Sequence, residues 1–242
     1  MKKHITAIWA ILAMLILMPG ASAQQKENSE PAMLDGTAAA FFSSAQKASR
    51  DSAVKIEGMF GGHGSGTYVQ LNGHYLVITA KHVVDRSDIY YVRTSTEKVV
   101  GQVIWRSKTK DMAVLKVPEL HSRKSVPLVR TGGLDVGDDI VYTGYPSSYE
   151  LLTAKGHVSG HAGDGRATLV QGFVWFGYSG SGAFDRSGRL RAIVYGIAVE
   201  NYRGLPQFLE TLVYTHEIER SDIAEINRAL ATPADTTPQA VP

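Results

Sequence analysis

The stretch Tyr75-Leu76-Val77-Ile78-Thr79 is an apolar, β-branched run, and it leads directly into Ala80-Lys81-His82-Val83-Val84. Such a run predicts a buried strand. His82 then stands just beyond the end of that strand, where a rigid element can hold a catalytic side chain. A single histidine beside valines is more often a core or surface residue, so other parts of the chain must decide its role.

Short apolar runs of the same kind lie on both sides of this stretch, separated by Gly, Asn and Asp turns. The first set predicts strands over 54–56, 66–71, 75–79, 89–92, 99–105 and 112–117, and the second over 139–142, 155–159, 168–170, 182–185 and 190–199. Residues 119–137 contain Pro127 and Gly132-Gly133 and are interpreted as a connector. Many short strands with few helices favour an all-β fold. We therefore expect two small β-barrels, over about 53–118 and about 137–214.

Helices are expected only near the two ends of this region. Alanine and phenylalanine between residues 37 and 49 predict a short helix within an N-terminal segment, 24–52. Ile223, Ile226 and Leu230 form one apolar stripe, which predicts a C-terminal helix over 215–231 capped by Thr215 or Ser221. Residues 232–242 are rich in proline and lack large core residues, so we expect a disordered tail.

The first 23 residues have the layout of a secretory signal peptide. The chain starts with basic residues and continues with an apolar run from Ile5 to Met18. The small residues Ala21-Ser22-Ala23 follow and fit a cleavage site. A membrane anchor is the alternative, but the run is shorter than the roughly 20 residues that span a bilayer. We expect removal after Ala23 and export, to a periplasm or to the outside of the cell, with no membrane partner afterwards.

Composition excludes several classes of function. The formal net charge of +2 includes Lys2 and Lys3, so the mature chain would be neutral and has no electrostatic basis for binding nucleic acid. The absence of cysteine excludes a cysteine nucleophile and thiolate metal sites. His157 and His161 have a metal-binding spacing only on a helix, and the surrounding glycines make a helix improbable. We expect no metal.

The stretch Gly177-Tyr178-Ser179-Gly180-Ser181-Gly182 predicts a tight turn that exposes a serine. Peptide hydrolysis by serine needs such a hydroxyl, an imidazole that takes its proton, and a carboxylate that orients the imidazole. It also needs N–H donors for the oxyanion, and the N–H groups of Gly177 and Ser179 suit this role. Asp111, at the start of a predicted strand, could supply the carboxylate, although such a residue is often only a turn or cap residue.

Three ordered motifs resemble those of trypsin-like serine proteases, most closely the HtrA/Deg branch. They are Ile78-Thr79-Ala80-Lys81-His82-Val83-Val84, Asp111-Met112-Ala113-Val114-Leu115-Lys116-Val117 and Gly177-Tyr178-Ser179-Gly180. Weaker matches are Gly64-Ser65-Gly66-Thr67, the stretch 137–146 and Gly156-His157-Val158-Ser159. The resemblance covers about residues 38–200.

The resemblance implies a chymotrypsin-like fold of two six-stranded barrels with the active site between them. It implies a serine endopeptidase with His82 as base, Asp111 as orienting carboxylate and Ser179 as nucleophile, acting on polypeptides without a metal or organic cofactor. It also places the substrate pocket near four residues, Phe173, Val174, Tyr195 and Gly196. No carboxylate occurs in 173–176, so we expect cleavage after apolar residues.

Two residues depart from the family pattern. Tyr178 stands before the nucleophile, where the family usually has Asn, Asp or Ser, and Ser181 replaces a usual glycine and is a rival nucleophile. The resemblance also ends too close to the C-terminus for a PDZ domain. The alternative function is a catalytically silent relative that binds exported polypeptides, while esterase activity is disfavoured because the strand–elbow–helix setting of α/β-hydrolases is absent.

Overall fold

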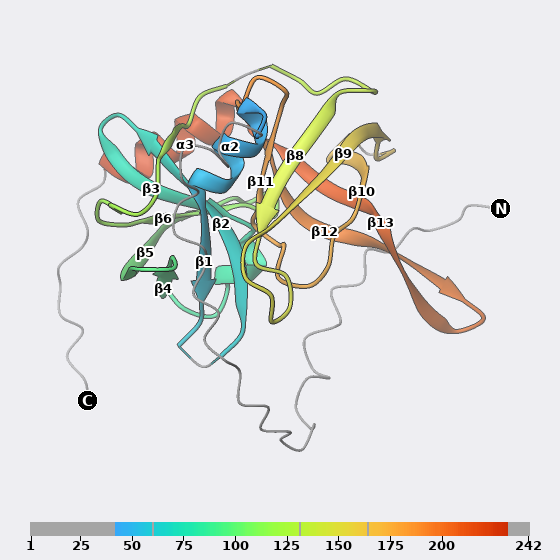
Figure 1. Ribbon diagram of the computed structural model, residues 1–242, viewed down its shortest axis with the longest axis horizontal. Coiled ribbons are helices and arrows are strands. Elements are labelled where there is room, and N and C mark those ends of the chain that lie inside the picture. The colour runs from blue at the N-terminus through green and yellow to red at the C-terminus, as the bar shows by residue number, and fades with distance from the viewer. Residues whose placement is uncertain (1–41, 60, 131, 164, 232–242) are drawn as a thin grey trace.

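A computed structural model of the protein describes residues 42–59, 61–130, 132–163 and 165–231. Over this part of the chain the fold consists of two β-barrels side by side, with two helices at the top of the view (Figure 1). The predicted signal peptide and tail, residues 1–23 and 232–242, lie outside the described residues.

The first barrel is antiparallel, and its strands follow the order β1-β4-β5-β6-β3-β2, closed by pairing of β1 with β2. A short seventh strand, β7 (Val126–Pro127), runs parallel to the far end of β2. The six barrel strands are β1 (Ala53–Glu57), β2 (His63–Leu71), β3 (His74–Thr79), β4 (Ile89–Arg93), β5 (Lys98–Arg106) and β6 (Ala113–Lys116).

The second barrel is also antiparallel and closes in the order β10-β13-β12-β11-β8-β9. The prediction of an all-β, two-barrel fold is therefore confirmed, although the predicted strands did not include β13 or β7. The six strands are β8 (Asp139–Gly144), β9 (Leu152–His161), β10 (Thr168–Gly172), β11 (Gly182–Phe184), β12 (Leu190–Tyr202) and β13 (Leu205–Glu217).

Both expected helices are present, with different bounds. Helix α2 (Ser44–Ser52) begins with a capping box between Ser43 and Gln46 and ends where β1 begins. Helix α3 (Arg220–Ala231) starts at Arg220 rather than at residue 215. Thr215 is not a helix cap: it is buried in β13, and its hydroxyl donates to the carbonyl of Thr168.

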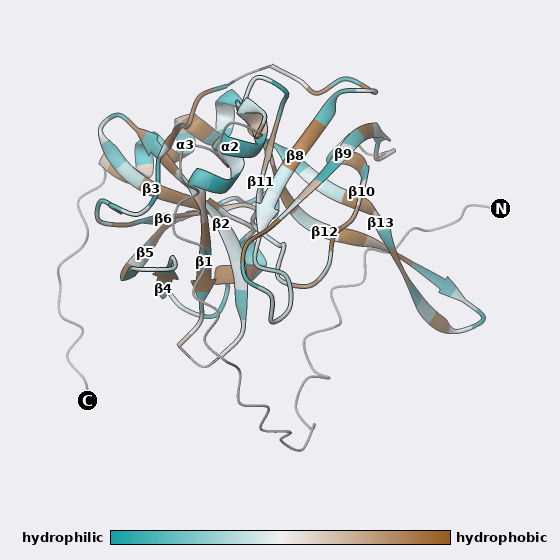
Figure 2. Ribbon diagram, in the orientation of Figure 1, coloured by the Kyte–Doolittle hydropathy of each residue, from teal (hydrophilic) through white to brown (hydrophobic). Residues whose placement is uncertain are grey.

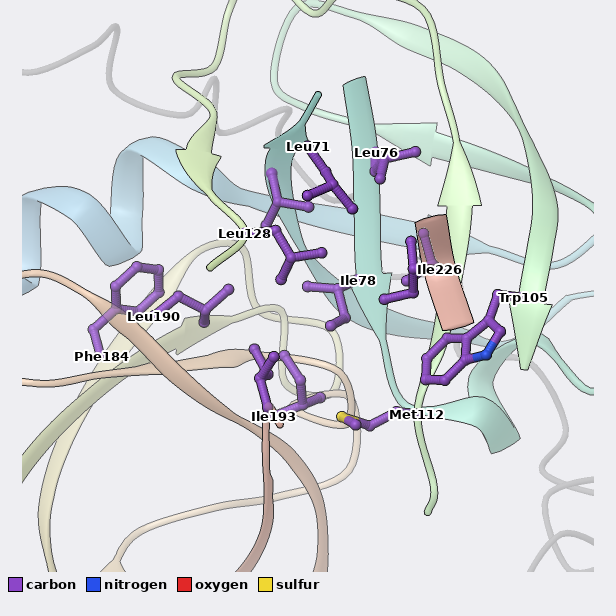
Figure 3. Close-up of a cluster of buried hydrophobic side chains, with 13 residues drawn as sticks. Leu71, Leu76, Ile78, Trp105, Met112, Leu128, Phe184, Leu190, Ile193 and Ile226 are labelled. Carbon is purple, nitrogen blue, oxygen red and sulfur yellow. The ribbon is translucent and has the colours of Figure 1, made fainter. Parts of the chain in front are cut away.

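The main hydrophobic cluster lies where the two barrels and α3 meet (Figure 3). Leu76 and Ile78 of β3 contribute from the first barrel, Phe184 and Ile193 from the second, and Ile226 from α3. Each barrel also has a smaller cluster inside it. Apolar segments accordingly recur along the strands of both barrels in Figure 2. None of the helices in the described ranges combines the length and apolar character needed to cross a bilayer.

Candidate active site

The topology of the first barrel brings His82 and Asp111 to the same edge. Strands β3 and β6 are antiparallel neighbours, with Thr79 opposite Ala113. The end of β3 therefore lies beside the start of β6. His82 follows β3 in a single turn of 3-10 helix, η1 (Lys81–Val84), and Asp111 precedes β6.

Asp111 holds His82 through two hydrogen bonds. Asp111 Oδ2 lies 2.7 Å from His82 Nδ1, and Asp111 Oδ1 accepts the backbone N–H of His82 at 2.9 Å. Burial alone would raise the pKa of Asp111, but the hydrogen bonds from His82 and the nearby His216 outweigh it, so this pKa lies below its usual value. The ionised carboxylate assigns the ring proton to Nδ1, which leaves Nε2 as the basic nitrogen.

The turn that carries Ser179 packs against β2 and against the end of β3, the strand that leads to His82. The carbonyl of Ser179 accepts the N–H of Ser65 in β2 at 2.8 Å. Gly180 has φ +93°, and a Cβ there would overlap Ser65 O and Thr79 Oγ1, so only glycine fits this close approach. Within the described ranges no hydrogen bond joins the Ser179 hydroxyl to His82. The structure thus brings His82 and Asp111 into direct contact and places Ser179 at the same junction between the barrels.

The two predicted oxyanion donors, the N–H groups of Gly177 and Ser179, donate no hydrogen bond to any residue that the structure describes. The carbonyl of Phe176 accepts the N–H of Ser147 at 2.7 Å. Because the N–H and C=O of a trans peptide point in opposite directions, this bond turns the N–H of Gly177 away from Ser147. Both donors are therefore available to an anionic oxygen.

Ser65 ties this turn to the first barrel and was missed by sequence reasoning. Its hydroxyl donates to the carbonyl of Gly177 at 2.6 Å and accepts the N–H of Tyr145 at 2.9 Å. Its carbonyl accepts the hydroxyl of Thr79 at 2.7 Å. Ser65 is fully buried. The motif Gly64-Ser65-Gly66-Thr67 resembled the entry to the first barrel, but nothing local in it signals contacts to residues so distant in the chain.

The two residues that depart from the family pattern are both buried. Tyr178 packs edge-on against Tyr142, with ring centroids 5.7 Å apart, and burial raises its pKa to about 12. It is therefore neutral and offers no ionic partner. Ser181 is 0% exposed, and its hydroxyl has no hydrogen-bond partner within the described part of the chain. A buried hydroxyl cannot reach a substrate, which argues against Ser181 as the rival nucleophile.

The four predicted pocket residues have different surroundings. Phe173 is 49% exposed, while Val174 belongs to the buried cluster of the second barrel. A Cβ added at Gly196 would meet no atom within 4 Å, so the space above it is open. Tyr195 stacks on His216, with ring centroids 4.0 Å apart. Burial lowers the pKa of His216, whose Nδ1 donates to the carbonyl of Arg166 at 2.8 Å.

His157 and His161 both lie on β9, a strand rather than a helix. Residues four apart on a strand are about 13 Å from each other, too far to share one ion. No group of three or more His, Asp or Glu side chains suited to a metal ion occurs in the described ranges.

Solved structures with the same fold include two of Rv3671c from M. tuberculosis. The inactive form of a Ser-to-Ala mutant of Rv3671c is 22% identical to this chain, with a TM-score of 0.58. The match covers 90% of this chain and 99% of that chain. Rv3671c protease in the inactive form is 21% identical, with a TM-score of 0.58 and coverage of 84% and 98%. The serine endoprotease from Yersinia pestis is 16% identical, with a TM-score of 0.60 and coverage of 77% and 65%. At these identities the likeness concerns the fold.

A search of curated proteins found no match. A comparison with protein families matches residues 64–193, more than half of the chain, to the trypsin-like peptidase domain. This range begins at the entry to β2 and ends within β12, so it includes His82, Asp111 and the turn around Ser179. By its fold and this match, the chain belongs to the trypsin-like peptidase family.

Proposed function

We propose that this chain is an exported serine endopeptidase in which His82, Asp111 and Ser179 act together. The observation that carries the proposal is the pair of hydrogen bonds by which Asp111 fixes both the backbone and the ring of His82. The serine turn beside this pair offers two unoccupied N–H donors. Family membership makes polypeptides the substrates.

In the proposed reaction, Ser179 Oγ attacks the carbonyl carbon of the scissile bond while its proton passes to His82 Nε2. The N–H groups of Gly177 and Ser179 stabilise the negative oxygen that forms. His82 then gives its proton to the leaving amine as the C–N bond breaks, and Asp111 stabilises the imidazolium in between. Water repeats both steps on the acyl-enzyme, which releases the new carboxyl terminus and restores Ser179.

The absence of a Ser179–His82 hydrogen bond is compatible with this mechanism. Catalytic hydrogen bonds are often long or misaligned without substrate and tighten when it binds. His82 is about one third exposed, so its ring can adjust. The groups held in place are Asp111, which is hydrogen-bonded to the ring, and the turn around Ser179, which is hydrogen-bonded to Ser65.

A fluorophosphonate probe tests the nucleophile, because it bonds only to an activated serine. We expect the wild-type protein to gain the mass of one probe less HF, because fluoride leaves as the serine oxygen bonds to phosphorus. Ser179→Ala should gain no mass, and its turnover of casein should be reduced on the order of 10⁶-fold. Ser181→Ala is the matched control and should still be labelled. A wild-type protein that stays unlabelled would instead support the catalytically silent binder.

The same intact-mass spectrum tests export. The proposal of export rests on residues 1–23 alone, which lie outside the described residues. Protein recovered from the periplasm or medium of an expressing bacterium should have the mass of a chain that begins at Gln24. Retention of residues 1–23 in that protein would contradict cleavage after Ala23.

For the residue before the cut we propose an apolar side chain. By the family resemblance, Phe173 and the open space above Gly196 border the substrate pocket, and segment 173–176 carries no carboxylate to pair with Arg or Lys. The peptides from the casein digestion give the cut-site profile directly. A profile dominated by Arg and Lys would contradict this specificity and leave the nucleophile assignment intact.

A further inference from the structure

Strands β12 and β13 continue beyond the second barrel as a projecting hairpin (Figure 1). Its turn is Arg203-Gly204, and both residues have positive φ, 52° and 87°, as a two-residue hairpin turn of type I′ requires. The hairpin leaves the barrel at a bulge, because Ile197 pairs with Val213 but the next residue, Ala198, pairs with Leu209. Residues 198–209 therefore form an arm outside the barrel.

One edge of this arm has no strand beside it. Strand β12 pairs with β11 only as far as Ile193, and over 198–202 its only strand partner in the described ranges is β13. The backbone N–H and C=O groups on the other side of 198–202 therefore face outward. An unpaired edge of this kind is a template for a further strand.

Pro206 identifies which groups face outward. Pro206 lies opposite Asn201 and has no N–H, so Asn201–Pro206 is a pair without mutual hydrogen bonds. The kind of pair alternates along an antiparallel ladder, so Val199–Phe208 is of the same kind. The N–H and C=O of Val199 and Asn201 thus point to the free edge of β12. On the opposite edge, Pro206 removes one of the donors.

The side chains of the arm are mostly apolar and exposed. Val199, Tyr202 and Leu205 are 37%, 56% and 70% exposed, and Glu200 and Arg203 are the charged residues of 198–209. Phe208 packs edge-on against Phe176, with ring centroids 5.9 Å apart. Apolar segments are visible along the projecting hairpin in Figure 2. The composition favours an uncharged, apolar partner over a charged one.

The arm is continuous with the proposed active site. On the same strand, the carbonyl of Val194 accepts the N–H of Gly180, the neighbour of Ser179, at 2.7 Å. From there β12 runs outward to the tip. The rise is at most about 3.3 Å per residue and is smaller across the bulge at Tyr195, so Val199 and Asn201 lie within about 16 and 23 Å of Val194 along the strand. A polypeptide antiparallel to β12, with its scissile bond at Ser179, would place its preceding residues along this edge.

We propose that the free edge of β12 at Val199 and Asn201 binds the part of an extended substrate that lies about five to seven residues before the scissile bond. The substrate adds a strand to the arm by backbone hydrogen bonds, and apolar side chains on its two faces pack beside Val199 and Tyr202, which lie on opposite faces of β12. This inference rests on the proposed function. It makes the protein selective for unfolded, apolar segments of some length over short peptides.

The test is a series of peptides with the same residues around the cut and two, four, six or eight residues before it. We expect kcat/KM to rise at least 10-fold between the four-residue and the eight-residue peptide. In the longest peptide, N-methylation of the residues that face Val199 and Asn201 should remove most of the gain, and methylation of the residue between them should not. Equal kcat/KM for all lengths above four overturns the inference.

Two protein variants locate the effect on the arm. The first variant replaces residues 201–206 with Asn-Gly and keeps the Glu200–Gln207 pair, which can flank a two-residue turn. It should reduce the ratio of kcat/KM between the eight-residue and the four-residue peptide at least three-fold. Gln207→Ala, on the paired strand, should keep the wild-type ratio. An unchanged ratio in the shortened variant overturns the inference.

Fluorophosphonate labelling of the wild type separates this inference from the proposed function. Labelling without a length effect refutes this inference alone, and no labelling refutes the proposed function as well.

Discussion

Ser65 shows how a single residue outside the proposed triad can determine the geometry of the nucleophile turn. Its hydroxyl and N–H donate to the carbonyls of Gly177 and Ser179, the two residues that we propose as oxyanion donors. Tyr178 offers no charge for an ion pair that would order this turn. The nucleophile turn is therefore held by hydrogen bonds from Ser65 and from Ser147.

We predict that Ser65→Ala lowers kcat for peptide hydrolysis by about 10- to 100-fold and leaves KM within about two-fold. Complete loss of an oxyanion donor typically lowers kcat by about 10²- to 10³-fold. The effect here should be smaller, because the donor is misplaced and not removed. Steady-state kinetics on one short peptide measures both constants. The matched control is Ser181→Ala, which removes an equally buried hydroxyl that has no hydrogen-bond partner in the described ranges. Equal losses of kcat in the two variants would refute a specific role for Ser65.

Local sequence was informative about some site residues and silent about others. His82, Asp111 and Ser179 each follow or precede a recognisable strand or turn, so spacing and motif were enough to predict them as a triad. The contacts of Ser65 with Tyr145 and Gly177 depend on how two barrels pack, and no local pattern encodes them. Burial of Ser181 argues for Ser179 as the nucleophile. In the sequence, the only feature that distinguished the two serines was the glycine two residues before Ser179.

At the scale of elements, α2 joins the two barrels. It leads directly into β1 of the first barrel, but its side chains contact the second. Ser49 donates to Thr143 of β8 at 2.7 Å, and Arg50 donates to Thr153 of β9 at 2.9 Å. The stretch just before the first strand is therefore a docked helix rather than a free terminus that could insert beside Ser179.

We predict that residues 24–242 with an added N-terminal tag hydrolyse peptides within about two-fold of the untagged rate, without trimming. An ammonium inserted beside Tyr178 would be buried without a partner, which is strongly unfavourable. As a control, a specific protease site placed between Ser52 and Ala53 should lower activity when cut, because cleavage detaches α2 from β1. A tagged protein that is inert until trimmed to a start near Ala53 would contradict this prediction.

Strand β13 was the least predictable element. Its outer half, from Leu205 to Leu209, includes Pro206 and Gln207, which weaken a strand pattern. Its inner half contains Thr215, whose hydroxyl suits a helix cap as well as a strand. The pairing with β10 and β12 decides between these, and pairing across the barrel cannot be seen in the local sequence. The β1–β6 runs were predictable because each is short, apolar and bounded by turn residues.

At the scale of the whole molecule, the shared core makes the two barrels one unit. Ile226 of α3 is fully buried among residues of both barrels, in the cluster of Figure 3. Polar contacts support the same contact surface: Trp105 Nε1 donates to Glu225 at 2.9 Å, and Lys110 Nζ lies 2.8 Å from Asp222. Unfolding of either barrel would expose the core of the other, so we expect a single cooperative transition.

We predict that Ile226→Ala keeps one transition and lowers its midpoint. Truncating a buried isoleucine costs about 2–5 kcal/mol. For a chain of this size each kcal/mol moves Tm by about 2–4 °C, so Tm should fall by roughly 4–20 °C. Differential scanning calorimetry measures both the number of transitions and the shift. Ile223→Ala is the matched control on the same helix: Ile223 is only partly buried against this cluster, so its loss should cost clearly less. If Ile226→Ala instead splits the trace into two transitions, the barrels unfold separately and α3 does not join them through a shared core.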